Sequence, residues 1–280
     1  MMINLLTKLD PYFIQIGSFT IYWYAIFIII GAILALAISK YFAKKAGYSS
    51  DMIDNLFFIS FPAGLIGARI WFVLSNLSAY TGANWYHAFF SWEGGLAIQG
   101  GVVFGALAGM IYIKKAHKEI EVKHVLDLVV PNILIAQAIG RWGNFFNQEV
   151  YGQCVDASKL SFLPKFILNQ MQGGGDIACA ITEVAQPLFL YEGILNILGF
   201  VLISILLRKF WKSRKNGSLA MSYFVWYGVV RVLLEPLRNE MYIMQIMGVR
   251  TSIITSIAFI VFGVLGIIYL NFFKKKKEVK

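Results

Sequence analysis

Apolar runs of about 20 residues recur along the whole chain, and they limit what it can fold into more than any other feature. A helix of about 20 apolar residues spans the hydrocarbon core of a bilayer. Hydrophobic residues make up 58% of the 280 residues and charged residues only 14%, against roughly a quarter charged in soluble domains. The sequence therefore predicts an all-α polytopic membrane protein.

Seven transmembrane helices are expected, in a single transmembrane domain over residues 1–280. The third run is rich in glycine, which allows packed helices to approach closely. The fourth contains Pro131, tolerable where neighbouring helices satisfy the freed carbonyl. The first run lacks a basic n-region and a cleavage site, so we expect it to be retained. The predicted spans are 19–39, 52–74, 95–113, 123–140, 187–207, 218–237 and 251–273.

Basic residues are concentrated in alternate loops. The segments after the first, third, fifth and seventh spans hold three, four, five and five Lys or Arg, which is 17 of the 25 in the chain. Because basic loops stay in the cytoplasm, we expect the C-terminus inside and the N-terminus outside. No soluble segment carries a basic face with interleaved aromatic residues, so we expect no nucleic-acid partner.

The longest segment on the outer side, residues 141–186, is predicted to form a small extracytoplasmic cap between the fourth and fifth spans. It holds the only two cysteines of the chain, Cys154 and Cys179. By this topology both face the oxidising side, where disulfides form. Two unrelated buried thiols fit the sequence equally well, because sequence does not determine the distance between them.

Polar side chains within these spans gather toward the outer ends. Counting about 1.5 Å per residue places them within about 10 Å of the outer interface. Ionisable groups inside a membrane are costly and usually mark function, and arginine suits a phosphate diester. We therefore expect a cationic site for an anionic phospholipid at headgroup depth, formed by Tyr24, Arg69, Gln99, Arg141, Arg231, Glu235 and Arg238.

Each of these residues also has a structural interpretation. Arg69 or Arg238 could extend toward lipid headgroups, and Tyr24 could be an interfacial aromatic residue. Glu235 could simply pair with the arginine four residues before it. Asp127, toward the cytoplasmic side, is expected to pair or cap structurally. The concentration of Arg, Gln, Asn and Tyr toward one leaflet favours a shared site.

The stretch GRWGNFFNQEVYG, residues 140–152, resembles the signature of bacterial prolipoprotein diacylglyceryl transferases, G-R-x-G-N-F-x-N-x-E-x-x-G. Its fixed positions here are Gly140, Arg141, Gly143, Asn144, Phe145, Asn147, Glu149 and Gly152. The resemblance extends over nearly the whole chain. Further stretches similar to motifs of that family are YWY (22–24), GARI (67–70), WEGGLAIQGG (92–101), PLFLYEG (187–193) and WYGVVRVLLEPLR (226–238).

The resemblance implies a reaction. Such enzymes transfer the sn-1,2-diacylglyceryl group from phosphatidylglycerol to the lipobox cysteine thiol of a preprolipoprotein signal peptide. A thioether forms and glycerol phosphate leaves, as the first step of lipoprotein maturation at the bacterial cell membrane. No metal or organic cofactor is involved. In the family, the arginines that correspond to Arg141 and Arg231 are implicated in binding the lipid phosphate.

The chemistry of the residues agrees with this reaction. Negative charge grows on the departing oxygen, so prealigned guanidinium groups can stabilise the transition state. We expect Asn144, Asn147 and Tyr227 to hold headgroup hydroxyls or the incoming peptide. We expect Glu149 to orient the signature arginine, since a nearby cation keeps a carboxylate ionised. The predicted catalytic residues are Tyr24, Gln99, Arg141 and Arg231, and the predicted substrate contacts are Arg69, Asn144, Asn147, Glu149, Gly152, Tyr227, Glu235 and Arg238.

Two positions depart from the family pattern. Gln99 stands where many members have a histidine that has been proposed as the base, and Gln186 precedes Pro187 where many have His-Pro. None of the three histidines present replaces the missing one, since two are predicted on the cytoplasmic side and one lies in an outer loop without a motif: His117, His124 and His87.

A catalytic histidine is therefore not expected. Either the thiol proton leaves through Tyr24 or water, or no dedicated base is needed, because a cysteine is already a few per cent thiolate at neutral pH and nearby arginines lower its pKa further. Gln99 is expected to keep only a hydrogen-bonding role. Two other functions are alternatives: an anion transporter, which also uses intramembrane arginines, and a lipid-binding assembly factor without catalytic activity.

Overall fold

The structure is a computed structural model, and it describes residues 8–17, 19–90, 95–172, 179–242, 245–246 and 249–273. The chain forms two compact units, residues 1–35 with 126–280 and residues 36–125, which are treated separately below. Among the described residues, five helical stretches are long and apolar enough to cross a membrane, which supports the prediction of a helical membrane protein. They are Trp23–Lys45, Ser50–Ser75, Val122–Asn147, Leu188–Phe210 and Thr251–Phe273.

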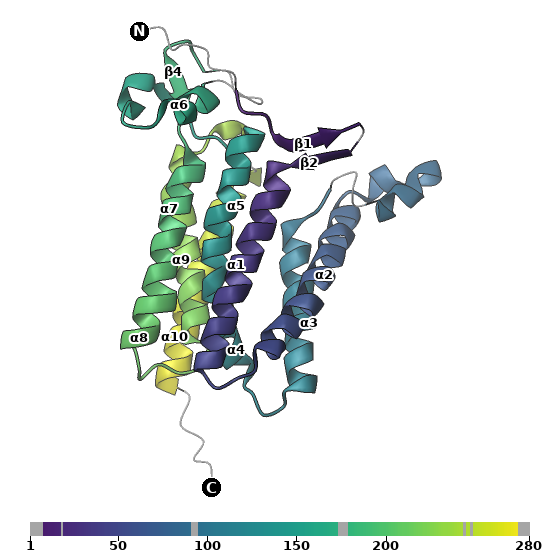
Figure 1. Cartoon of the computed structure of the whole chain (residues 1–280), viewed down its shortest axis with the longest axis vertical. Helices are drawn as coiled ribbons and strands as arrows, with labels where there is room; N and C mark the ends of the chain where they lie inside the picture. Colours follow the sequence, from purple (N-terminus) through teal and green to yellow (C-terminus); the bar gives the residue numbers. More distant parts are fainter. Residues whose placement is uncertain are drawn as a thin grey trace. The chain divides into compact units, whose positions relative to one another are not determined.

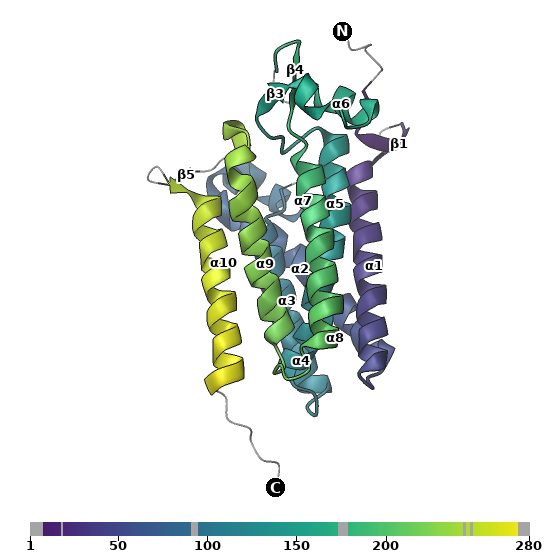
Figure 2. The ribbon, with the colours of Figure 1, turned by 90° about the vertical axis from the view of Figure 1, so that its left-hand side faces the viewer.

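The larger unit is a set of helices that lie side by side (Figures 1 and 2). Between α5 and α7 the chain forms a small cap, in which two strands pair antiparallel. Helix α1 (Trp23–Lys45) belongs to this unit as far as residue 35. The other helices are α5 (Ile133–Asn147), α7 (Leu188–Phe200) with its continuations η6 (Val201–Leu207) and α8 (Arg208–Phe210), α9 (Ser218–Leu234) with η7 (Glu235–Leu237), and α10 (Thr251–Ile268) with η9 (Tyr269–Phe273).

A proline separates α5 from the helix before it. Helix α4 (Val122–Val129) leads into a 3-10 turn, η4 (Val130–Asn132), which contains Pro131. Proline has no N–H and cannot bond the carbonyl four residues earlier. That carbonyl, of Asp127, accepts from Nη2 of Arg208 at 2.6 Å instead. A neighbouring helix therefore satisfies the freed carbonyl, as expected from the sequence.

The carboxylate of Asp127 caps the start of α9. Its two oxygens accept from the backbone N–H groups of Gly217 and Ala220, each at 2.9 Å. A helix N-terminus presents N–H groups without internal partners and carries partial positive charge, so a buried carboxylate is well placed there. The structural role expected for Asp127 is confirmed.

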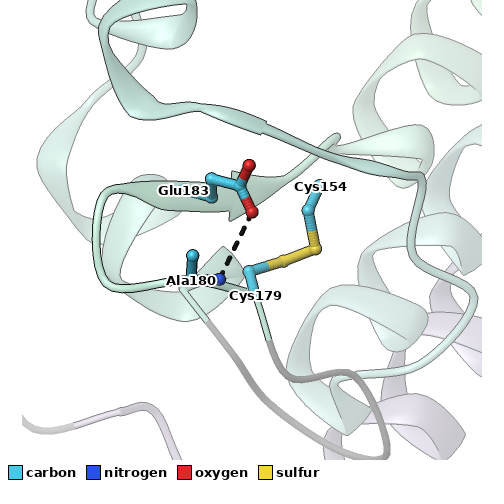
Figure 3. The surroundings of a disulfide bond; sticks show 4 residues. All are labelled: Cys154, Cys179, Ala180 and Glu183. Atoms are coloured by element: carbon cyan, nitrogen blue, oxygen red, sulfur yellow. Dashed lines mark hydrogen bonds between the residues drawn. A yellow bond between two sulfur atoms is a disulfide. The ribbon is translucent and has the colours of Figure 1, made fainter.

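The cap has a small core of its own, built on the ends of α5 and α7. Strands β3 (Cys154–Asp156) and β4 (Glu183–Ala185) pair antiparallel, with η5 (Ala157–Leu160) and α6 (Lys165–Met171) between them in the chain. Cys154 and Cys179 form a disulfide with their Cα atoms 5.6 Å apart (Figure 3). The buried core side chains are Phe145, Tyr151, Leu160, Ile167, Met171, Val184 and Phe189.

The chain departs from the predicted boundaries at two places. Helix α5 continues through the signature to Asn147 and ends at Gln148, whose backbone is left-handed with φ of 55°. The predicted fourth span ended at residue 140, because an apolar run stops at the first charge. The helix does not stop there, since its polar side chains find partners within the protein.

The second departure lies at the N-terminus. The predicted first span began at residue 19, but residues Phe19–Tyr22 form strand β2, which pairs with β1 (Tyr12–Ile16). Helix α1 begins at Trp23. Short runs of aromatic and β-branched residues suit a strand as well as a helix. A third short pair, β5 (Gln245–Ile246) and β6 (Val249–Arg250), was not predicted either.

The smaller unit is built around α2 (Ser50–Ser75) and α3 (Ile98–Ala116), connected through η1 (Leu77–Tyr80) and η2 (Gly82–Phe89). The two helices pack through glycine: a methyl group added to Gly100 would overlap the carbonyl of Gly67. The close approach expected from the glycine-rich run is confirmed. Helices α3 and α9 occupy the third and sixth predicted spans but are not among the five stretches named above.

The disulfide should stabilise the cap specifically. Closing a loop with a sequence separation of 25 restricts the unfolded cap, and such bonds contribute about 3 kcal/mol. The double variant Cys154→Ser, Cys179→Ser is expected to exchange its amide hydrogens in residues 154–172 about a hundred times faster, while exchange in α7 and α9 is unchanged. Equal exchange in oxidised wild type and variant would contradict this.

Candidate functional site

Three helices of the larger unit meet at a buried carboxylate. Glu192 on α7 accepts from Nη2 of Arg141 on α5, and its second oxygen accepts from Nη1 of Arg231 on α9 at 3.5 Å. The side chains are 5%, 22% and 13% exposed, respectively. A carboxylate this deeply buried requires compensating charge. Glu192 therefore holds Arg141 and Arg231 side by side. These are the two arginines that sequence analysis expected to bind phosphate.

A second acidic group holds the other side of Arg231. Glu235, on η7, is buried, and its Oε2 lies 4.0 Å from Nη2 of Arg231. The pairing across one helical turn that the sequence suggested is thus present. Burial lowers the pKa of the Arg238 guanidinium, and Arg231 adds to this effect, while Glu235 and Glu192 oppose it.

The signature contributes an amide network on the outer turn of α5. Asn144 accepts through Oδ1 from Nη1 of Arg141 at 3.3 Å and donates through Nδ2 to Glu149 at 2.8 Å. Sequence analysis expected Glu149 to orient Arg141. Among the described residues, the contact between them runs through Asn144, and the carboxylate that pairs directly with Arg141 is Glu192.

The glycine at position 152 brings the end of the signature onto the end of α9. Gly152 forms an isolated β-bridge with Arg238 and donates its N–H to the carbonyl of Gln186 at 3.0 Å. A methyl group here would lie 2.6 Å from the Cβ of Gln186 and 2.9 Å from the carbonyl of Leu237. Only glycine permits this approach, so Gly152 serves to join the signature to Arg238.

Tyr24 packs directly on the signature helix. It is the second residue of α1, and a methyl group at Gly143 would overlap its ring. Its ring therefore lies against the turn of α5 that carries Arg141 and Asn144. The preceding Trp23 stacks on Phe146 with ring centroids 4.9 Å apart. These contacts hold Tyr24 beside the arginine cluster.

Two further predicted contacts lie in the same unit. Asn147, the last residue of α5, has a buried Oδ1 that no described residue contacts by a hydrogen bond. Tyr227 lies on α9, one turn before Arg231, and stacks on Tyr223 with centroids 6.0 Å apart. Of the twelve predicted site residues, ten therefore belong to this unit.

The other two belong to the smaller unit. Arg69 on α2 is buried, and its guanidinium donates to the backbone carbonyls of Ala88 at 2.8 Å, Gly95 at 3.1 Å and His87. These contacts give Arg69 a role that sequence analysis did not consider: it holds the connection between α2 and α3, where an extension toward lipid headgroups was the structural interpretation. Gln99 is exposed on the first turn of α3. Part of the motif before it, residues 92–94, lies outside the described residues.

The cluster holds nearly as many carboxylates as guanidinium groups. Four guanidinium groups are accompanied by three carboxylates, two of which sequence analysis had named, and the guanidinium of Arg250 donates to the backbone carbonyl of Glu235 at 3.2 Å. Directed N–H donors therefore matter for an anion as well as net charge. The seven residues are Arg141, Arg231, Arg238, Arg250, Glu149, Glu192 and Glu235.

Glu192 was absent from the predicted site. The sequence does contain a signal for Glu192, because this residue is a carboxylate within a long apolar run and lies in the PLFLYEG stretch. Intramembrane carboxylates usually mark function. Within the described residues, no cluster of three or more His, Cys, Asp or Glu side chains could hold a metal ion.

Comparison with known proteins gives a match over most of the chain. The family model for prolipoprotein diacylglyceryl transferase matches residues 11–269. The chain belongs to this family. It is 40% identical over 263 residues to the phosphatidylglycerol–prolipoprotein diacylglyceryl transferases of Streptococcus pneumoniae strains ATCC 700669 and Taiwan19F-14, and this match covers 94% of this chain and 95% of each relative.

Loss of the shared carboxylate should destabilise the helices it joins. Glu192→Gln leaves two partly buried guanidinium groups without their shared carboxylate, and breaking a fully buried pair costs about 3–5 kcal/mol. We expect a clear drop in the unfolding temperature in detergent. The control Glu183→Gln, in the cap, should change it little. An unchanged unfolding temperature in Glu192→Gln would contradict the pairing.

Proposed function

We propose that this chain transfers the sn-1,2-diacylglyceryl group of phosphatidylglycerol to the lipobox cysteine of preprolipoproteins, forming a thioether and releasing glycerol phosphate. The observation that carries the proposal is the arginine pair held by Glu192 in a chain of this family. The relatives are named for phosphatidylglycerol and prolipoprotein.

In this proposal Arg141 and Arg231 bind the lipid phosphate. A guanidinium has five N–H donors in a planar fork, which is more than the contacts to Glu192, Asn144 and Glu235 use. The remaining donors suit phosphate oxygens, which accept two parallel N–H bonds. The carboxylates hold the forks in place before the lipid arrives, so little reorganisation remains for the reaction.

The reaction forms a bond from sulfur to a glycerol carbon and breaks the bond from that carbon to a phosphate oxygen. The bonding electrons leave with the oxygen, and the thiol proton is released. Because the departing phosphate gains a charge, N–H donors bind the transition state more tightly than the ground state. Arg141 and Arg231 stabilise this charge, and Asn144 and Asn147 hold headgroup hydroxyls or peptide.

Proton removal needs no strong base in this proposal. Tyr24, against the turn of α5 that carries Arg141, offers a hydroxyl through which the thiol proton can leave toward water. Nearby guanidinium groups favour the thiolate. Gln99 takes a hydrogen-bonding role where many family members have histidine.

We further propose seven spans, with the N-terminus and the cap outside and the C-terminus in the cytoplasm of a bacterial cell. The distribution of Lys and Arg supports this orientation, although part of the last basic cluster, residues 274–280, lies outside the described residues. A disulfide in the cap is in keeping with an oxidising compartment. The lipid then enters from the outer leaflet, and the partners are phosphatidylglycerol, the bilayer and the signal peptide.

Neither alternative from the sequence gains support. A transporter would need polar groups across the membrane, whereas the charged cluster lies at the cap end of α5, α7 and α9. An inactive assembly factor would have no need to retain the arginine pair and its carboxylates.

The first test uses purified protein in phosphatidylglycerol vesicles with a synthetic lipobox peptide, followed by mass spectrometry. The wild type should add one diacylglyceryl group per peptide. Arg141→Ala and Arg231→Ala should each lower the rate at least a hundredfold, because each removes a donor to the developing charge. Lys165→Ala, which removes an exposed cation on α6, serves as the control and should keep the wild-type rate.

The role of Gln99 is tested by two substitutions in the same assay. If its amide positions substrate, Gln99→Ala should abolish transfer, while Gln99→His, which retains a donor, should keep the wild-type rate. A large rate increase in Gln99→His would show instead that the wild type lacks a base.

A further inference from the structure

A second polar level lies one helical turn below the arginine cluster. Helices α5 and α9 run toward the cap and α7 runs away from it, so residues four positions from Arg141, Glu192 and Arg231 share a level, at about 6 Å along the axis. These residues are Gln137, Asn196 and Tyr227.

Contacts between the helices confirm this register. A methyl group on Gly193 would lie 3.6 Å from the carbonyl oxygen of Ala138, which places the two helices side by side just below the salt bridge. Nε2 of Gln137 donates to the hydroxyl of Tyr223 at 3.0 Å, and Tyr223 stacks on Tyr227. Gln137 therefore links α5 to α9 through the phenol that lies one turn below Tyr227.

Two members of this level have buried polar atoms without a hydrogen-bond partner among the described residues, Gln137 at its Oε1 and Asn196 at both ends of its amide. The Asn196 side chain is fully buried on α7, yet neither its Nδ2 nor its Oδ1 has a hydrogen-bond partner among the described residues. Burying an unpaired amide costs about 1–3 kcal/mol by protein mutational data. In a bilayer, where no lipid tail offers a partner, polar groups must be satisfied by protein, water or ligand.

The chain provides a direct comparison in Asn132, which is equally buried. There, Nδ2 donates to the carbonyl of Leu128 at 2.7 Å and Oδ1 accepts from Ser204 at 2.9 Å. A buried asparagine with a structural role thus has both ends paired in this protein. Asn196 has neither, which points to a partner outside the chain.

The lipid offers such a partner at the right distance. When the phosphate lies at the arginines, the acyl chains must extend along the apolar length of the helices. The ester groups then lie between the phosphate and the acyl chains. Five single bonds of about 1.5 Å separate phosphorus from the nearer ester carbonyl carbon, a span of about 5–6 Å when bent. One helical turn covers the same distance.

We propose that the Nδ2 of Asn196 donates a hydrogen bond to an ester carbonyl of the diacylglyceryl group, an inference that rests on the proposed function. An ester carbonyl only accepts, so the amide N–H is the atom that recognises it. Asn196 then holds the glycerol backbone from below while the arginines hold the phosphate from above. The reacting carbon lies between these two points and is fixed by both.

This contact makes the enzyme selective for ester-linked over ether-linked lipid, which can be measured. Vesicles of equal parts diacyl phosphatidylglycerol and its dialkyl ether analogue are offered with a lipobox peptide, and the two products are separated by mass. The wild type should favour the diacyl lipid about tenfold, the factor that a hydrogen bond of about 1.4 kcal/mol gives. In Asn196→Leu, which has a similar volume, the ratio should fall to about one.

The substitution should lower only the rate of transfer from the diacyl lipid. Asn196→Leu is expected to transfer the dialkyl group at the wild-type rate and the diacyl group about ten times more slowly. Asn132→Leu, the matched control, should keep the wild-type ratio. Asn196→Ala removes the same amide without a branched side chain and should also give a ratio of one, so the test stands if the leucine variant fails to fold.

Thermal unfolding separates this role from a structural one. Because Asn196 has no partner within the described residues, Asn196→Leu should unfold at or above the wild-type temperature, whereas Asn132→Leu should unfold below it. A wild-type ratio near one, or a tenfold ratio retained in Asn196→Leu and Asn196→Ala, would overturn the inference while leaving the transferase intact. No transfer of either lipid by the wild type would overturn the proposed function itself.

Discussion

A carboxylate buried among three helices and shared by two guanidinium groups determines how the larger unit is arranged. The Glu192 side chain is only 5% exposed, and a buried carboxylate requires compensating charge. Arg141 and Arg231 provide it from different helices, so α5, α7 and α9 are fixed in register at one level. Everything else in the site is placed by this register: the amide network of Asn144 lies above it and the level of Asn196 lies below.

The balance of charge in the cluster changes how an anionic lipid is recognised. A site with a large positive charge would attract any anion, including abundant free phosphate. Here, carboxylates offset most of the positive charge and hold forks of N–H donors in place, so binding depends on where the ligand places its oxygen atoms. Such preorganised dipoles are also what stabilises a charge that appears only in the transition state. Glu192 and Glu235 therefore support catalysis by orienting the arginines, although their charge opposes that of the substrate.

Sequence reasoning succeeded where one physical rule dominates and failed where two compete. Long apolar runs predict helices reliably because only a helix satisfies its backbone within lipid. The strand Phe19–Tyr22 was merged with the helix that follows it, since a short aromatic run fits both. Helix α5 passes beyond Arg141 because its charges are paired from other helices, and such pairing cannot be read from the chain. Arg69 fits a lipid site by depth alone, yet its contacts are to backbone carbonyls.

The interior of α5, α7 and α9 changes in polarity with each helical turn away from the cap. The outermost level is charged, with Arg141, Glu192 and Arg231. The next holds amides and phenol groups. Farther from the cap, Leu134, Ile203 and Leu219 are buried around the ring of Tyr223, beside the hydrogen-bonded pair of Asn132 and Ser204. The first two levels follow the order of phosphate and ester along a phospholipid. An unpaired amide is costly anywhere in a bilayer, and it is least costly at the one level where a bound lipid supplies a carbonyl. The position of Asn196 therefore follows from the ligand as much as from the fold.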